Sequence, residues 1–275
     1  MADLEQNGLL LEAAFRTGSF EQAEQDARAA ERSAQQQGRH GAVARARVQL
    51  GLIRHYQSIL RSHRPPEDAA AAEEEALFRS ALTLAEAVAD KACAAAALLG
   101  IGLVEQVTRR DWNEAMPYFR RAEALIPELR TSGDAYTESE IQRRLGLYFL
   151  VADTRPERAL HHLGLAHAII ERGGDERLIP SILTALASAE RARGSALTSA
   201  ELARGSALTS AELARDSALT SAERARGAYE RAVALAEKAA QRAREAGLSA
   251  LWVAEAEQEL RAARAALTAS PPASA

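Results

Sequence analysis

The chemistry that this sequence could support centres on arginine, because one stretch is basic and lacks acidic residues. Between Arg32 and Pro66 there are seven arginines, three histidines and no aspartate or glutamate. On a helix that turns 100° per residue, Arg47, Arg54 and Arg61 recur every seven residues and form one stripe. Guanidinium groups bind carboxylates and phosphates through two parallel hydrogen bonds, so this stripe is suited to binding an anion.

Two interpretations of the stripe remain open. His55 shares its polar arc, and apolar side chains fill the rest of residues 43–64, so we expect a mostly buried helix with one exposed basic strip. In the first interpretation, acidic side chains on neighbouring helices pair with the strip. In the second, the strip binds an acidic peptide or a phosphate-bearing ligand through four side chains, Arg47, Arg54, His55 and Arg61.

No other combination of side chains forms a recognisable catalytic or metal-binding pattern. His161, His162 and His167 lack the three- or four-residue spacing that places two metal ligands on one helix face. The run Glu73-Glu74-Glu75 is expected to be an exposed helix start, favoured by the helix dipole, and not an acid–base pair. Cys93 has no recognisable base or orienting group. We therefore expect no catalytic residue, no metal and no cofactor, and a protein that is not an enzyme.

Composition favours close-packed helices in a soluble protein. The 275 residues are 47% apolar but only 4% aromatic, and they are dominated by alanine, leucine, glutamate, arginine and glutamine, which all favour helix. The net charge of −4 argues against a nucleic-acid coat, and the single cysteine excludes an intrachain disulfide. We see no signal peptide and no stretch of about 18 apolar residues that could span a bilayer. These features predict a cytoplasmic protein without membrane contact.

The elements that must position these residues recur along the chain as a helix, a turn and a second helix with an alanine stripe. A turn at Gly18-Ser19-Phe20 follows an apolar helix from Leu9 to Phe15. A turn at Asp111-Trp112 precedes a stripe of small and aromatic residues, Ala115, Phe119 and Ala122, and Pro127 closes this unit.

Three further units follow the same order with variations. In one, Leu145-Gly146 and Phe149 lie on the first helix, the capping box Thr154-Arg155-Pro156-Glu157 starts the second, and its stripe is Ala159, Leu163 and Ala166. In the last, the turn is Gly227-Ala228-Tyr229 and the stripe is Ala232, Ala236 and Ala239. A split unit has Leu50-Gly51 on its first helix, a Pro65-Pro66 loop, and a second helix from about Glu73 to Ala89.

These motifs resemble the tetratricopeptide repeat family of bacterial helical repeat proteins, over nearly residues 4 to 268. The resemblance implies a stack of helix pairs whose concave surface holds a peptide or a helix. Some members of that family clamp a C-terminal carboxylate with an asparagine directly after the conserved glycine. Leu52 and Leu147 occupy that position here, so this mode is not expected. The motifs are also similar to the repeat sensor domains of bacterial regulatory ATPases.

The most unusual segment is an eleven-residue sequence written four times between residues 184 and 227. The copies read TALASAERARG, SALTSAELARG, SALTSAELARD and SALTSAERARG. Eleven residues make three turns at about 3.67 per turn, which favours a straight helix or a slight right-handed supercoil. Residues 195–227 could form one long helix, which we favour, or several short helices that fold back, for example from a capping box at Thr198.

The expected fold is all-α: an α-α superhelix of about five tetratricopeptide-like helix pairs, a C-terminal capping helix and a helical insertion of the eleven-residue repeat. Residues 1–194 hold four repeats and the first helix of the fifth, and 195–227 are the insertion. Residues 228–269 supply the last second helix and the capping helix, and 270–275 a disordered tail. We expect a protein-interaction scaffold that binds a protein or peptide, with an acidic partner fitting the stripe. The alternatives are nucleic-acid binding through the arginine face, which the composition disfavours, and self-association into a homo-oligomer through the repeat arm.

Overall fold

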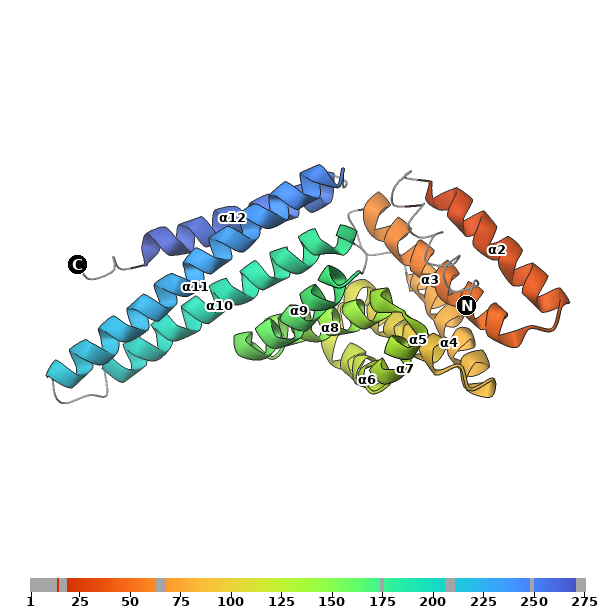
Figure 1. Ribbon diagram of the computed structural model, residues 1–275, viewed down its shortest axis with the longest axis horizontal. Coiled ribbons are helices and arrows are strands. Elements are labelled where there is room, and N and C mark those ends of the chain that lie inside the picture. Colours follow the sequence, from red (N-terminus) through yellow and green to blue (C-terminus); the bar gives the residue numbers. More distant parts are fainter. Residues whose placement is uncertain are drawn as a thin grey trace. The chain divides into compact units, whose positions relative to one another are not determined.

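The computed structural model describes residues 14, 19–62, 68–173, 176–205, 211–247 and 250–270 (Figure 1). Of these, residues 60–62, 68, 177, 201–205, 211–220 and 251 are described by their backbone alone. The described residues contain eleven α-helices, and the chain is 89% helical without a strand among them. The all-α prediction is therefore confirmed.

The chain divides into two compact units, Met1–Ile141 and Gln142–Ala275. The first unit contains α2 (Phe20–Gln36), α3 (His40–Ser62), α4 (Asp68–Ala87), α5 (Lys91–Leu103), the π-helical turn η1 (Val104–Thr108), α6 (Trp112–Glu123) and α7 (Ile126–Ser132). Helix α8 (Ala135–Val151) begins in the first unit and ends in the second. The second unit continues with α9 (Pro156–Glu171), the 3-10 turn η2 (Glu176–Leu178), α10 (Ile179–Gly205), α11 (Ala211–Glu245) and α12 (Ala250–Ala269).

Helix ends in the first unit follow local sequence. The Asp90 carboxylate accepts a hydrogen bond from the Cys93 N–H at 3.0 Å and caps α5, and Asp111 caps α6 by accepting from the N–H groups of Asn113 and Glu114. Each carboxylate satisfies donors that the first helical turn leaves without a backbone partner. Gly133 ends α7 with φ at 76°, a conformation that favours glycine.

The predicted capping box at Thr154 is wrong. Thr154 has φ at 50°, and the residue that caps α9 is Arg155, whose side chain makes no capping hydrogen bond. The Arg155 N–H bonds back to the Phe149 carbonyl at 2.7 Å, so Thr154 belongs to the termination of α8. A residue in that left-handed conformation cannot also present the extended backbone of an N-cap. Pro156 does occupy the first turn of α9, as expected.

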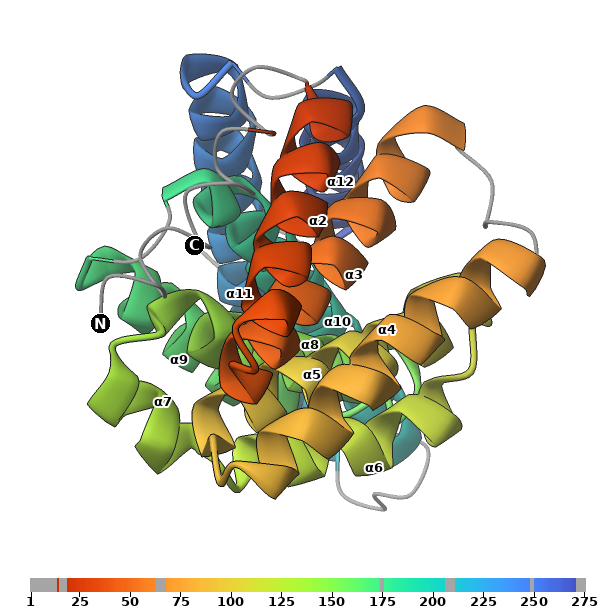
Figure 2. The same cartoon turned by 90° about the vertical axis from the view of Figure 1, so that its right-hand side faces the viewer.

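In the first unit, consecutive helices pack side by side from α2 to α6 (Figure 2). Helix α3 also contacts α5, and α5 contacts α7. Every residue from Cys93 to Leu103 is buried, so α5 forms the centre of this unit. The segment Lys91–Thr108 has a mean hydropathy of 1.3, enough by length and composition for a membrane span, so the expectation that no segment could span a bilayer is wrong on composition. Because 78% of it is buried among neighbouring helices, its hydropathy matches that of a core helix.

Glycines in this unit let aromatic rings approach a neighbouring helix closely. Gly51 in α3 and Gly100 in α5 both face Phe78 of α4, and a Cβ atom on Gly51 would lie 2.5 Å from the ring. Gly102 in α5 faces Phe119 of α6 in the same way. Both rings are fully buried. The space left by the missing glycine side chain on one helix is therefore filled by an aromatic ring from the next helix.

The second unit repeats this packing with other side chains. Gly146 of α8 faces Leu163 of α9, and Gly194 of α10 faces Tyr229 of α11, where an added Cβ atom would lie 2.6 Å from Cε1. In sequence, a small residue lies four positions before and three positions after each bulky residue, and all of these small residues are buried: Ala115, Ala122, Ala159, Ala166, Ala225 and Ala232. The same local arrangement therefore occurs at Phe119, Leu163 and Tyr229.

The eleven-residue copies are divided between two helices of this unit. Residues 195–205 end α10, residues 211–227 begin α11, and these helices pack on each other and on α12 (Figure 1). Residues 206–210 lie outside the described residues. The structure thus differs from both shapes expected for residues 195–227, because the copies lengthen the two arms of one helical hairpin.

Two local expectations are wrong because the residues concerned lie inside long helices. Thr198 does not begin a helix: its hydroxyl donates to the Gly194 carbonyl at 3.1 Å inside α10. The predicted turn at Gly227-Ala228-Tyr229 lies within α11. The side chain that faces Gly194 is that of Tyr229. The core of this hairpin therefore includes Ala225, although the sequence predicts that Ala225 lies in the insertion.

Candidate functional site

The arginine stripe lies on α3, between the acidic faces of α2 and α4. Arg47 Nε donates to Glu31 of α2 at 2.7 Å, and its Nη1 donates to the Ser80 hydroxyl of α4. Arg54 Nε donates to Glu24 of α2 at 3.1 Å, and its Nη1 lies 3.2 Å from Glu73 of α4. Each arginine therefore links three helices. This is the arrangement that the first interpretation of the stripe describes.

Both guanidinium groups stay partly accessible to solvent. The Arg47 and Arg54 side chains are 24% and 27% exposed, and their partners Glu31 and Glu24 are 18% and 20% exposed. Burial by itself would raise the pKa of Glu24, but hydrogen bonds and charge from Arg28 and Arg54 outweigh it and lower that pKa. Glu24 is thus held in its charged form by two arginines.

His55 does not lie on an exposed strip. Its side chain is 1% exposed, and Nδ1 lies 2.8 Å from the Glu74 carboxylate, which is itself buried. One residue beyond Arg54, the helix has turned by 100°, which directs His55 towards α4. Glu74 stands four residues before Phe78, where the corresponding helices have Ala115 and Ala159. The Nε2 atom of His55 has no hydrogen-bond partner among the described residues.

The fourth predicted residue, Arg61, lies near the end of α3, and its side chain is outside the described residues. The structure therefore brings Arg47 and Arg54 into one polar layer and places His55 in the core behind it. Gly51, which lies between Arg47 and Arg54 in the sequence, is buried against Phe78.

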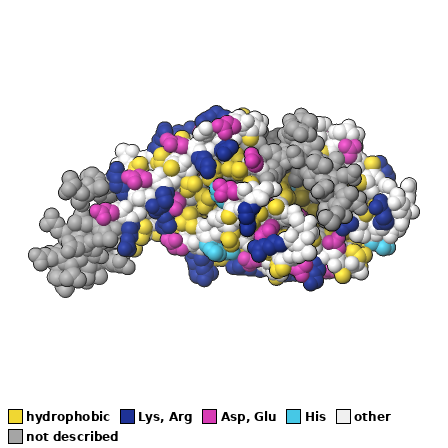
Figure 3. All heavy atoms as spheres, in the orientation of Figure 1, with side chains coloured by type: hydrophobic (Ala, Val, Ile, Leu, Met, Phe, Trp, Pro, Cys, Tyr) yellow, Lys and Arg dark blue, Asp and Glu magenta, His cyan; other side chains and the backbone are white. Residues whose placement is uncertain are grey.

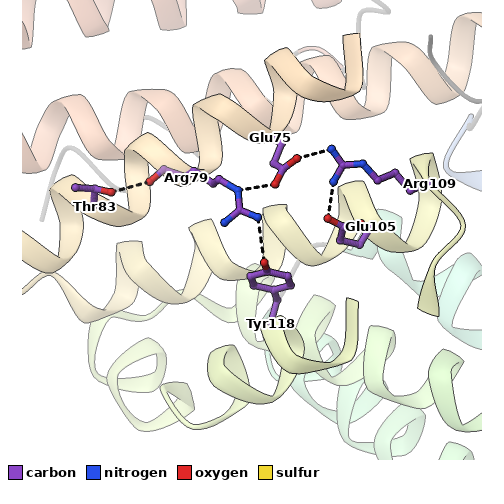
Figure 4. A network of polar contacts seen from close by, with 6 residues as sticks. All are labelled: Glu75, Arg79, Thr83, Glu105, Arg109 and Tyr118. Atoms are coloured by element: carbon purple, nitrogen blue, oxygen red, sulfur yellow. Dashed lines mark hydrogen bonds and ion pairs between the residues drawn. The ribbon is translucent and has the colours of Figure 1, made fainter. Parts of the chain in front are cut away.

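A second polar network went unrecognised in the sequence. Glu75 of α4 pairs with Arg79 at 2.5 Å and with Arg109, which follows η1, and Arg109 also pairs with Glu105 at 2.5 Å (Figure 4). Arg79 reaches the Tyr118 hydroxyl of α6 at 3.0 Å. Glu75 had been assigned to an exposed helix start, but its side chain is only 14% exposed. The four-residue spacings in this network were the available signal.

The network has a defined charge state. Burial would raise the pKa of Glu75, but hydrogen bonds from Arg109 and Arg79 outweigh it and lower that pKa. The network contains two carboxylates, of Glu75 and Glu105, and two guanidinium groups, of Arg79 and Arg109, so the numbers of acidic and basic groups are equal. The network thus fastens α4, η1 and α6 together without leaving an excess charge for a ligand.

The second unit contains a further ionic layer on α10. Glu190 is 7% exposed and accepts hydrogen bonds from Arg193 at 2.5 Å and from Arg231 of α11 at 3.2 Å. Arg191 binds Glu259 of α12 through two hydrogen bonds of 2.8 and 3.1 Å. The same seven residues, SAERARG, recur at 221–227, where Glu223 and Arg224 are exposed. The glutamate and the first arginine of this sequence thus belong to the ionic layer in one copy and are exposed in the other.

The potentially reactive side chains of His162 and Cys93 are held by packing and hydrogen bonding within the fold. His162 lies 2.8 Å from the Gln142 amide and stacks on Phe149, with ring centroids 5.3 Å apart. Burial raises the pKa of the Cys93 thiol to about 12, which keeps it protonated at neutral pH. Within the described ranges, no group of three His, Cys, Asp or Glu side chains could hold a metal ion.

Among the described residues on the face shown in Figure 3, basic and acidic side chains are interspersed. The arrangement as a whole joins helices through charged pairs, and the partly exposed Arg47 and Arg54 are the sequence-predicted groups that a partner could reach. A scan of the chain against protein-family models found no match, and a search of curated proteins found no relative.

Proposed function

We propose that this chain is a non-catalytic interaction scaffold of the tetratricopeptide type, which binds a peptide or a partner protein. The observation that carries the proposal is the recurring packing unit, in which a glycine on one helix faces a bulky residue that lies between two small ones on the next. It occurs at Phe119, Leu163 and Tyr229. Such recurrence is what a chain of repeated helix pairs requires.

Stacked helix pairs bury their apolar faces only against their neighbours, so the stack exposes a long surface suited to a peptide or helix. The proposal includes a superhelix of about five such pairs, closed by α12. In support, Ala254, Gln258 and Arg261 of α12 are exposed, whereas Ala256 and Ala263 are buried. A terminal helix with one polar face is what a capped stack needs.

The proposed partner is acidic and meets α3 at Arg47 and Arg54. A partner carboxylate would share or replace the bonds that these arginines make with Glu31 and Glu24, at side chains that are about one quarter exposed. Arg61 belongs to the proposed contact, and the buried His55 does not. We propose binding in the cytoplasm, without nucleic acid or membrane.

Charge reversal tests this function. The variant Arg47→Glu/Arg54→Glu and a control with the same change in net charge, Arg120→Glu/Arg121→Glu on the exposed side of α6, are immobilised as baits in lysate of the source cells. We expect the control to capture the same proteins as the wild type. The α3 variant should lose at least one of them while it still melts cooperatively, at a lower temperature because the new acids face Glu31, Glu24 and Glu73.

Other outcomes have distinct meanings. If the α3 variant unfolds, the arginines serve only to join helices, and the acidic-partner surface is rejected. If it folds and captures every partner, the binding surface lies elsewhere. If no protein captured by the wild type binds it saturably in a test with the purified components, the scaffold proposal fails.

A further inference from the structure

Two carboxylates of α2 match the arginine stripe of α3 in spacing, and α2 lies along α3 (Figure 2). Glu24 and Glu31 are seven residues apart, and the two arginines that they bind are also seven apart. Glu24, in the first half of α2, binds Arg54 at 3.1 Å. Glu31, in the second half, binds Arg47 at 2.7 Å. The two helices therefore run antiparallel and are joined by ion pairs about two helical turns apart.

Helix α2 itself buries few apolar groups. Its buried side chains are one aromatic ring and three methyl groups, those of Phe20, Ala23, Ala27 and Ala34. On the opposite side of the helix, Gln25, Ala29 and Arg32 are exposed. A segment with little buried apolar surface separates from a fold at a lower cost in free energy than the core does. Separation of α2 from α3 therefore leaves the core around α5 in place.

The joint between α2 and α3 is short and exposed. Helix α2 ends at Gln36, α3 begins at His40, and all three residues between them, Gln37, Gly38 and Arg39, are exposed. Gly38 has φ at 66°, a conformation that favours glycine. Rotation at this joint lets α2 leave α3 without moving a buried residue of the joint.

We propose that the partner of the α3 face that carries Arg47 and Arg54 is an amphipathic helix of another protein with two carboxylates seven residues apart, and that α2 occupies this face until the partner displaces it. The inference rests on the proposed function, because it names the partner of that same surface. The partner helix has a small residue between its carboxylates, as α2 has Ala27, which is 1% exposed. Because α2 and the partner bind the same arginines, each weakens the binding of the other.

A synthetic peptide and full-length chains test this competition. The probe is a fluorescein-labelled peptide with the sequence of residues 19–37, and fluorescence anisotropy measures its binding to each purified chain. In the variant Glu24→Arg/Glu31→Arg, the arginines of α3 repel the resident α2. We expect this variant to bind the peptide about tenfold more tightly than the wild type, whose own α2 competes at high effective concentration.

The matched control is Glu21→Arg/Asp26→Arg. It makes the same change in net charge on α2, but at two exposed side chains outside the ion pairs with α3. Because its Glu24 and Glu31 still bind α3, this control should bind the peptide as weakly as the wild type does. Circular dichroism first establishes that every variant melts cooperatively.

Reversal of the α3 face locates the contact. Arg47→Glu/Arg54→Glu should bind a peptide that carries Glu24→Arg/Glu31→Arg about tenfold more tightly than the wild-type chain binds that same peptide. Each reversed chain then prefers the peptide of complementary charge, which unfolding of either chain would not produce. A peptide that carries Ala27→Leu should bind the Glu24→Arg/Glu31→Arg chain at least about tenfold more weakly, because the larger side chain holds the carboxylates away from the arginines.

Three results would overturn the inference. The unchanged peptide could bind Glu24→Arg/Glu31→Arg no more tightly than it binds the control, or bind neither chain. Arg47→Glu/Arg54→Glu could show no preference between the two peptides, which would place the contact elsewhere. Light scattering could show a wild-type dimer that Arg47→Glu/Arg54→Glu abolishes, which would make α2 of a second copy the occupant.

The peptide test and the lysate test fail separately. If the peptides show no charge preference but the α3 variant still loses a protein in lysate, the scaffold function stands and its partner is not an acidic helix. If the peptides behave as expected but the wild type captures no specific protein, the displaceable α2 contact stands and the scaffold function fails.

Discussion

The close approach of Gly194 to Tyr229 predicts opposite effects for two glycine substitutions in identical sequence. Both Gly194 and Gly227 end a SAERARG segment, and both lie inside a helix. A Cβ atom at residue 194 would lie 2.6 Å from Tyr229 Cε1 and 2.9 Å from two further ring atoms. At residue 227, the nearest atom is the flexible end of Arg231, at 3.4 Å.

The expected free energies follow from two terms. Alanine improves helix propensity over glycine by about 1 kcal/mol at either position. Overpacking in a tight core costs about 1–3 kcal/mol, and it applies only at residue 194 because the Tyr229 ring must move. Gly227→Ala should therefore raise the free energy of unfolding by about 1 kcal/mol. Gly194→Ala should leave it unchanged or lower it by about 2 kcal/mol.

Urea denaturation followed by circular dichroism measures both variants, and a double-mutant cycle with Tyr229→Leu isolates the contact. A smaller side chain at residue 229 should relieve the strain of Gly194→Ala and leave Gly227→Ala unaffected. Equal stabilisation by the two alanines would refute the reasoning, since it would mean that α10 and α11 do not pack in the register described.

Four other outcomes are expected. Deleting one copy, residues 206–216, should preserve cooperative melting, because Gly194 and Tyr229 stay 24 residues apart and the similar pair Gly102 and Phe119 is only 17 apart. Deleting residues 195–227 should abolish cooperative melting of the second unit. Gly194 and Tyr229 would then be two residues apart, too few to form the hairpin, and the buried Ala225 would be lost. Glu74→Ala, which leaves His55 buried without its partner, should cost about 1–3 kcal/mol in chemical denaturation, whereas its exposed neighbour Glu73→Ala should cost less than about 0.5 kcal/mol. The lowered pKa values of Glu24 and Glu75 contribute stability that is fully present above the unfolded pKa of about 4.3 and is lost as pH falls through the lower folded values. The variant Glu24→Gln/Glu75→Gln should therefore flatten the stability profile on the acid side of that unfolded pKa. Cys93 should react with a thiol reagent at the rate of global unfolding, and rapid labelling of the native protein would show that α5 is not buried.

The helical class could be predicted because it depends on composition and on local periodicity. The stripe Ala115, Phe119 and Ala122 was recognisable from its spacing, and all three side chains are buried. The apolar character of the segment around Cys93 was underestimated, because Lys91–Thr108 reaches the hydropathy of a membrane span.

What could not be predicted depends on which helix covers which face. The spacing of Arg47 and Arg54 shows a stripe, but only packing brings Glu31, Glu24 and Glu73 onto it from two other helices. His55 is one residue from Arg54 and is buried because α4 carries Glu74 at a position that elsewhere holds alanine. The place where the long hairpin reverses could not be predicted because the eleven-residue copies on either side of it are nearly the same.

When a hairpin built from copies of eleven residues changes length, even and odd numbers of added copies have different effects. Two added copies give each arm eleven residues, which are three full turns and about 16 Å, so every side chain at the tip returns to its original face. One added copy gives each arm five and a half residues, a turn and a half, and presents the opposite face of the tip. Related chains with different copy numbers should therefore fall into two classes, odd and even, that share the core around Gly194 and Tyr229 but offer different surfaces at the end of the arm.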